Sequence, residues 1–291
     1  MPAIPQTLDD PLKWADWLEI YALEHKDQSS SISDLERELN RNSVETEERE
    51  QRCASVSTEL GLRSIGAADG YPFTFDGSLL KQKDEWTKYI PYVFCLFLSY
   101  FDGAKKKHKN IYPDRIFEHV SRIAAQNYVD GHAVRFGWPR VEAEIPKPFS
   151  QAVERICVHL GEVRHNGNKP GHAKDDELDL VVWKHFPDGR EGKIILWGQC
   201  AAGWDWETKL TFDPNAFRNR WMQGDFVNPL LKSIFIPHVV ESTRWHYVSA
   251  AAKILFDRCR IASCTFDEAD VAAHSGNMKT WCDWILKENS K

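Results

Sequence analysis

The sequence predicts an α/β protein with a mainly helical N-terminal half and a C-terminal half that contains a sheet. Apolar residues recur at helical spacing through most of the first 146 residues. After a proline-rich stretch at 139–148, short apolar runs typical of buried strands alternate with helical segments, in the order α-β-β-α-β-α-β-α. We therefore expect two domains, 1–146 and 147–291.

The first predicted helix covers residues 10–24, where aromatic and aliphatic side chains share one face. Asp10 is suited to cap it and Pro11 to occupy its first turn. A short helix follows, for which Ser33 and Glu36 have the spacing of a capping box. Both helices therefore have local start signals.

Four further segments complete the N-terminal half. Residues 44–60 are highly charged and predict an exposed helix, for which a coiled-coil arm is one interpretation. Residues 71–80 predict a hairpin with an Asp-Gly turn. Residues 85–101 predict a buried helix, and 113–129 an amphipathic one.

In the C-terminal half, residues 149–163 predict a helix that ends near a glycine. Strands follow at 178–183 and 193–198, and the tight Pro-Asp-Gly connection between them favours antiparallel pairing. The remaining predicted elements are strands at 232–240 and 253–256 and helical segments within 212–231, at 247–252 and at 266–287.

Composition limits the class of protein. The net charge of −6 excludes a globally basic, nucleic-acid-coating surface. One basic run, at 104–110, is either a solvated loop or a phosphate-contacting one. Seven scattered cysteines without a CxxC pair indicate neither a disulfide framework nor a zinc ribbon. No apolar run reaches the ~20 residues of a membrane helix, and no signal peptide is visible, so we expect a cytoplasmic protein without a membrane partner.

An acidic cluster at 175–179 leads into the first of the two paired strands. Asp179 is surrounded by apolar residues, and a buried carboxylate is costly unless it has a partner. The next strand ends at Gln199, and Glu162 lies at the end of the preceding helix. Carboxylate and amide oxygens suit Mg²⁺ or Mn²⁺, so these residues are candidate metal ligands. The alternatives are a solvated acidic loop, a buried amide that satisfies backbone groups, and a surface carboxylate at a helix end.

The segment from Lys174 to Asp179, followed by a strand, a turn and the sequence Ile194–Cys200, resembles the catalytic core of PD-(D/E)XK nucleases of the restriction-endonuclease type. The resemblance covers about residues 148–265 and implies a restriction-endonuclease-like α-β-β-α-β core with a mixed sheet. By position, Asp179 matches the metal-binding Asp of the family. Gln199 matches the Glu or Gln on the next strand, and Glu162 matches the acid on the preceding helix.

The chain departs from this pattern at the motif lysine, whose position is occupied by Ala201. In the family that lysine orients the attacking water and stabilises charge in the transition state. Lys209 lies just beyond the strand and is a candidate replacement; the alternative is a surface lysine. Trp204 and Trp206 stack bases or fill the core, and the core is the commoner role.

The resemblance implies an Mg²⁺-dependent endonuclease that hydrolyses DNA phosphodiester bonds, with Glu162, Asp179 and Gln199 on the metal and Lys209 near the water. It also suggests a restriction or anti-phage defence effector. The helical N-terminal half would then contact a partner defence protein or form a homo-oligomer. The alternative is a catalytically inactive binding subunit of a larger defence or nucleic-acid-processing complex.

Overall fold

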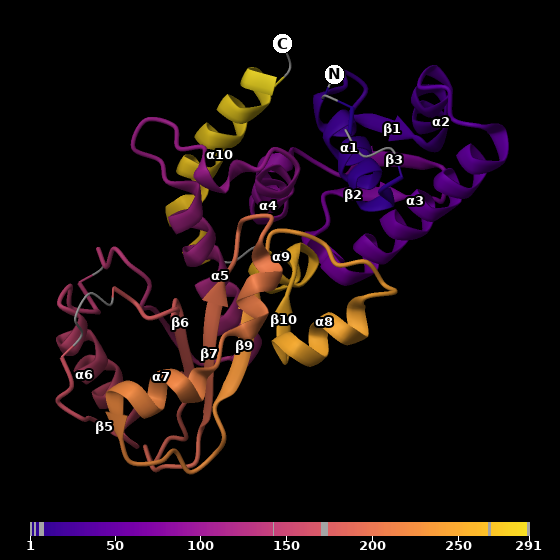
Figure 1. Ribbon diagram of the computed structural model, residues 1–291. Helices are drawn as coiled ribbons and strands as arrows, with labels where there is room; N and C mark the ends of the chain where they lie inside the picture. Colours follow the sequence, from indigo (N-terminus) through magenta and orange to yellow (C-terminus); the bar gives the residue numbers. More distant parts are fainter. Residues whose placement is uncertain are drawn as a thin grey trace. The chain divides into compact units, whose positions relative to one another are not determined.

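The computed structural model describes residues 2, 4–5, 9–141, 143–169, 174–266 and 269–289. The chain is a mixed α/β protein that folds into two compact units (Figure 1). The first unit comprises residues 1–113, 237–241 and 258–291, and the second comprises residues 114–236 and 242–257. Within the described residues, no helix is both long and apolar enough to cross a membrane.

The first unit combines helices with a small sheet of strand order β1-β3-β2. Its helices are α1 (Pro11–Glu24), α2 (Ile32–Arg41), α3 (Thr46–Ala67), α4 (Ile90–Tyr100), α9 (Arg258–Thr265) and α10 (Ala269–Asn289). Its strands are β1 (Ser29–Ser31), β2 (Phe73–Phe75) and β3 (Leu79–Gln82). The antiparallel pairing of β2 with β3 confirms the predicted hairpin.

The start of α1 is capped as predicted, because the Asp10 carboxylate accepts from the Leu12 N–H at 2.9 Å. The cap of α2 differs from the prediction. Ser31 has extended backbone and accepts from the Asp34 N–H at 3.2 Å, and the Asp34 carboxylate accepts from the Ser31 N–H at 2.8 Å. The capping box is therefore two residues earlier than expected, and Ser33 lies inside the helix.

Charged α3 is anchored by a buried ionic cluster. Arg63 donates to Asp16 at 2.7 Å, to Glu19 at 2.9 Å and to Glu59 at 2.7 Å, and Arg258 also pairs with Asp16. The Arg63 side chain is 1% exposed. Because isolated buried charges are strongly disfavoured, these groups depend on one another. The helix is therefore packed into its unit and is not a free arm.

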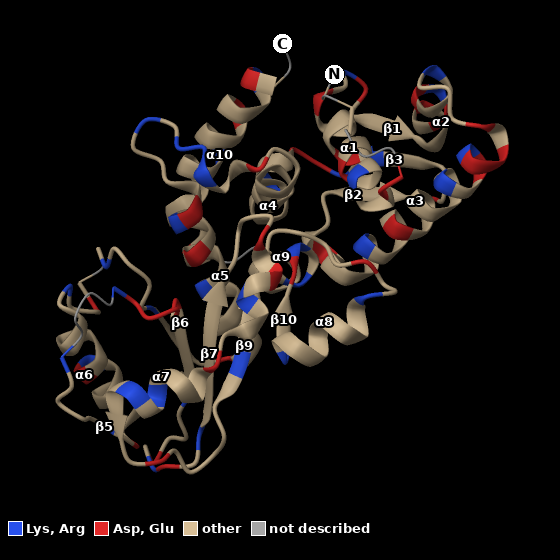
Figure 2. Cartoon of the chain, in the orientation of Figure 1, with Lys and Arg blue, Asp and Glu red and all other residues tan. Residues whose placement is uncertain are grey.

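The basic run at 104–110 belongs to the first unit, where it begins in a 3₁₀ helix (Gly103–Lys105) and continues as a loop (Figure 2). The Trp281 indole N–H of α10 donates to the Lys106 carbonyl at 2.7 Å, which fastens this loop to the C-terminal helix. The final helix belongs to this unit, since Trp281 also packs edge-on against Phe94 of α4.

The second unit is built on a five-stranded sheet of order β10-β9-β7-β6-β4. Its strands are β4 (His132–Arg135), β6 (Leu180–Lys184), β7 (Ile194–Cys200), β9 (Leu231–Phe235) and β10 (Ile254–Phe256), with a separate short pair β5 (Arg164–His165) and β8 (Met222–Gln223). Its helices are α5 (Pro113–Val129), α6 (Phe149–Leu160), α7 (Pro214–Trp221) and α8 (Trp245–Ala252), with a 3₁₀ helix η4 (Trp206–Thr211).

The sheet is mixed, because β4, β6 and β7 form an antiparallel meander and β9 and β10 continue it in parallel. Leu180 pairs with Gly198 and Lys184 with Ile194, which confirms the predicted pairing of the two central strands. Strand β4 was not expected. It places the start of the sheet before the proline-rich stretch, so the division between units falls near residue 113 and not at 146.

The side chains of β7 alternate between the two faces of the sheet. On one face, Trp197 packs edge-on against Phe217 of α7. Phe136, just after β4, contacts the same Phe217 and also Phe149 of α6. Helices α6 and α7 therefore cover this face, whereas Cys200 is on the other one.

Candidate functional site

Asp179 is held at the point where three strands end or begin. Its N–H donates to the Gly198 carbonyl at 3.0 Å, and its carbonyl accepts from the Phe136 N–H at 2.6 Å. Its carboxylate Oδ2 accepts from the Cys200 N–H at 2.8 Å. These bonds fix the start of β6 between the end of β4 and the end of β7.

Glu118 of α5 brings a second carboxylate to Asp179. A Cβ atom on Gly137 would lie 2.8 Å from Glu118 Oε2 and 3.0 Å from Asp179 Oδ1, so both carboxylates face this glycine. A side chain at position 137 would therefore crowd both carboxylates. Arg135 Nε donates to Glu118 Oε2 at 2.5 Å and sets the orientation of that carboxylate.

The surroundings of this carboxylate pair favour a proton or a cation. Burial raises the pKa of Glu118 to about 7, with Arg135 opposing and Asp114 and Asp175 adding to the rise. Burial and the charge of Glu118 likewise raise the pKa of Asp179 well above its usual range, against the Cys200 N–H bond. Burial is thus the main cause of both raised pKa values, and the single positive charge of Arg135 offsets it only in part.

The pair remains reachable from solvent. The Glu118 side chain is 15% exposed, and Asp179 is half-buried. The thiol of Cys200 lies beside the pair, and burial followed by the charges of Asp179 and Glu118 raises its pKa well above the usual range. Cys200 is therefore a neutral thiol, unsuited to act as a nucleophile.

Gln199 lies in the chain between the Gly198 and Cys200 contacts of Asp179. It is buried, and its Oε1 has no hydrogen-bond partner within the described residues. Strand alternation places it on the face of Trp197, opposite Cys200. The structure therefore brings the backbone of Gln199 to Asp179, while its amide is on the other face from Glu118.

Glu162 is not at this site. Its carboxylate accepts from the Gly192 N–H and the Val227 N–H, each at 3.1 Å, and pairs with Lys193 at 3.3 Å. Burial opposes the charged form, but the two N–H donors and the Lys193 ammonium together lower the pKa of Glu162.

Lys193 immediately precedes the first residue of β7, whereas Asp179 contacts the last residue of that strand. Glu162 and Asp179 are thus at opposite ends of β7, contrary to the expectation that they share one site. The physical reason is that Glu162 pairs with Lys193 just before β7 begins, whereas Asp179 precedes Leu180, which pairs with Gly198 near the end of β7. The helix acid beside Asp179 is Glu118.

Lys209 lies in η4, and its ammonium is 4.0 Å from Glu177, two residues before Asp179. Its side chain is 39% exposed. Ala201, at the position of the motif lysine, is buried, and its N–H donates to the Phe235 carbonyl at 2.8 Å. The structure thus brings Lys209 to the acidic turn next to Asp179 and leaves no amine at position 201.

The other acids of this turn have partners. Asp176 is bound by Arg220 and by the Trp221 indole N–H, the latter at 2.7 Å. Asp175 accepts from the Trp138 N–H at 3.1 Å. In the part of the chain that the structure describes, no group of three or more His, Cys, Asp or Glu side chains is arranged to hold a metal ion. Among the described residues at this end of the sheet, Glu118 and Asp179 are the two carboxylates that face Gly137.

Comparisons with protein-family models, with curated proteins and with solved structures found no match.

Proposed function

We propose that this chain is a metal-dependent nuclease that hydrolyses DNA, with Glu118 and Asp179 at its centre. The observation that carries the proposal is the pair of carboxylates facing Gly137, both with raised pKa values. Support also comes from its setting: an acid-bearing helix, an Asp at the start of one strand and the end of the neighbouring strand meet at one point. The resemblance to PD-(D/E)XK nucleases includes an acid-bearing helix and such an Asp, although here the helix is α5, the Gln199 amide is on the other face and Ala201 replaces the motif lysine.

The donors fit a hard cation such as Mg²⁺ or Mn²⁺, since carboxylate oxygens are its usual protein ligands. A cation would also stabilise the charged forms of both carboxylates, which burial disfavours. Mg²⁺ commonly binds through one or two carboxylates and keeps several waters, so a third acidic side chain is not required. Asp179 and Glu118 would hold the ion, which when bound supplies an activated water and offsets phosphate charge.

The chain's own residues would contribute binding and orientation. Arg135 holds the Glu118 carboxylate in place, and Gly137 keeps the space between the two acids open. Lys209, at the neighbouring acidic turn, would provide a positive charge for the phosphate backbone. Trp204 is 47% exposed, whereas Trp206 is buried, so Trp204 is the candidate for base stacking.

The role in restriction or anti-phage defence rests on the resemblance. The first unit would then serve as the contact for a partner defence protein or for a second copy. An inactive binding subunit is the second candidate, and the observation that favours it is the replacement of the motif lysine by the buried Ala201. Lys209, the candidate replacement for that lysine, is also already paired with Glu177.

Cleavage of supercoiled plasmid by the full-length chain with Mg²⁺ or Mn²⁺ tests the proposal. We expect Asp179→Asn and Glu118→Gln each to lower the rate at least about 100-fold, the scale of losing a group that stabilises transition-state charge. Lys209→Ala should cost about tenfold, roughly 1.4 kcal/mol in the barrier. The control is Glu154→Gln, which changes an exposed glutamate of α6 and should leave the rate unchanged.

Circular dichroism would establish that each variant is folded. Activity that survives both carboxylate substitutions would reject this site. Absence of cleavage of any DNA or RNA by the unaltered chain, with partners supplied, would favour the inactive binding subunit.

A further inference from the structure

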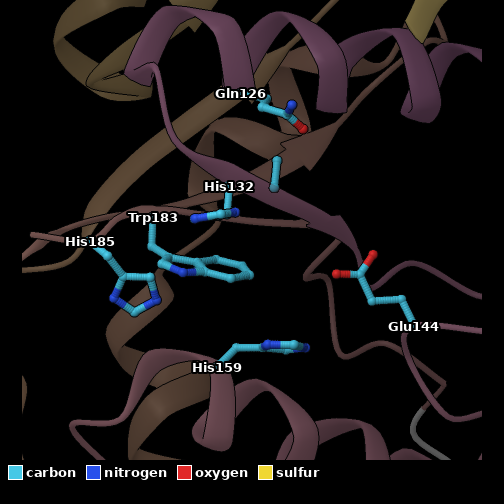
Figure 3. Close-up of a pocket in the computed structure, with 7 residues that line it drawn as sticks. Gln126, His132, Glu144, His159, Trp183 and His185 are labelled. Atoms are coloured by element: carbon cyan, nitrogen blue, oxygen red, sulfur yellow. The ribbon is translucent and has the colours of Figure 1, made fainter. Parts of the chain in front are cut away.

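A cavity lies within the second unit, near the end of β6 opposite to Asp179 (Figure 3). Its volume is about 390 Å³. Side chains from α5, β4, α6 and β6 and from two adjoining loops line it: Gln126, His132, Glu144, His159, Trp183 and His185. Cavities of this size accommodate small organic molecules.

Trp183 is the central side chain of this cavity. Its ring stacks on His132 at 5.6 Å between centroids and on His159 at 5.3 Å, and the two imidazoles lie on opposite sides of it in Figure 3. His185 approaches the same ring edge-on at 6.1 Å. Because His132 and His159 cover both faces of the indole ring, a ligand would contact the ring at its edge, where the N–H group lies.

Three nitrogen atoms in this cavity are buried without a hydrogen-bond partner in the described structure. They are Trp183 Nε1, His159 Nε2 and His185 Nδ1, and Trp183 is only 3% exposed. Gln126 Oε1 accepts from Arg122 at 2.8 Å, which leaves the Gln126 amide to donate. An unpaired buried polar group costs about 1–3 kcal/mol. Trp183 Nε1 is always a donor, and each imidazole nitrogen donates when it carries a proton, so the cavity favours a ligand that supplies acceptors.

We propose that this cavity binds a small organic molecule through an oxyanion, either a carboxylate or a phosphate. The lining is rich in groups that donate N–H bonds: an indole, a primary amide and three imidazoles. Glu144 is the lining carboxylate, and it is exposed. The volume exceeds what a bare inorganic ion fills, so the rest of the molecule would occupy the remaining space.

The histidines would make this binding sensitive to pH. Burial lowers the pKa of His159, Glu144 opposes this, and Arg155 and His132 add to it. Burial, Lys193 and His132 lower the pKa of His185, and the His159 carbonyl opposes this. Of the nearby charges, Lys184 pairs with Asp130 and Arg122 binds Gln126.

Both imidazoles are therefore neutral near pH 7, and an oxyanion favours their protonated forms. Affinity should consequently increase as the pH falls.

Titrations of the ¹⁵N-labelled full-length chain, followed through the indole N–H signals, test this proposal. The probes are inorganic sulfate, which keeps its double charge, ribose 5-phosphate and succinate, and Trp183→Phe identifies the Trp183 signal. We expect that signal to move with at least one organic probe, and sulfate to bind about tenfold more tightly near pH 6 than near pH 8. The two organic probes distinguish phosphate from carboxylate.

Two histidine substitutions provide the matched comparison. His159→Gln should weaken binding of the organic probe about tenfold, whereas His246→Gln, on the exposed surface of α8, should leave it unchanged. A Trp183 signal that does not move with any probe would overturn the proposal. Equal affinity for sulfate and both organic probes would overturn the assignment of an organic ligand.

Discussion

Replacing Glu118 by glutamine should change how the stability of the protein depends on pH. The pKa of this carboxyl is about 7 in the folded protein and 4.5 as an unperturbed side chain. A group whose pKa is raised by folding stabilises the fold fully below its unfolded pKa, and this contribution is lost as the pH rises through its folded pKa. At about 1.36 kcal/mol per pKa unit, the loss between pH 4.5 and pH 7 approaches about 3 kcal/mol.

Urea unfolding measured from about pH 5 to about pH 8 in the presence of a chelator checks this value. The unaltered protein should lose stability over that range, and Glu118→Gln should lose about 3 kcal/mol less. Glu154→Gln, the exposed control on α6, should follow the unaltered protein. Parallel curves for Glu118→Gln and the unaltered protein would refute the assignment of a raised Glu118 pKa.

Three further substitutions test the buried ionic cluster of the first unit, the close packing at Gly198 and the role of Gly137. Arg63→Ala should destabilise the first unit by about 3–5 kcal/mol in urea unfolding, because it leaves buried carboxylates such as Glu59 without their partner. A loss of stability below about 1 kcal/mol would contradict this. Gly198→Ala should cost about 1–3 kcal/mol, because the new Cβ would lie 2.6 Å from the Phe235 ring, and an unchanged melting temperature would argue against that contact. Gly137→Ala should weaken Mn²⁺ binding by about tenfold, since its Cβ would enter the space between the two carboxylates, and calorimetry giving unchanged affinity would exclude this role.

The sequence was informative where local chemistry determines structure. The alternation of apolar runs with a tight turn predicted the β6–β7 pair, and it is present with antiparallel register. The position of Asp179 at the start of β6 follows from that pairing. The α1 cap was likewise predictable, since Asp10 precedes a proline at the first helical position.

The sequence could not identify the second carboxylate. Glu118 is far from Asp179 along the chain, and the two meet because β4 pairs with β6 and α5 packs beside it. Strand β4 is four residues long, too short for its pattern to stand out between α5 and the prolines. Recognising a strand at 132–135 would have pointed to α5, not α6, as the helix that supplies the acid.

The division into units was also beyond local patterns. The final helix α10 returns to the first unit, where Trp281 packs on Phe94. Contacts between residues so distant in the chain depend on the shape of the whole core. The proline-rich stretch at 139–148, on which the expected boundary at 146 was based, therefore lies inside the second unit.

Calorimetric titration of the metal-free protein with Mn²⁺ would establish whether Glu118 and Asp179 bind a cation, because it measures binding without requiring a substrate. The unaltered chain should bind, Asp179→Asn and Glu118→Gln should each weaken binding at least about tenfold, and Glu154→Gln should bind as the unaltered chain does. Equal affinity in all four proteins would contradict a cation site between Glu118 and Asp179.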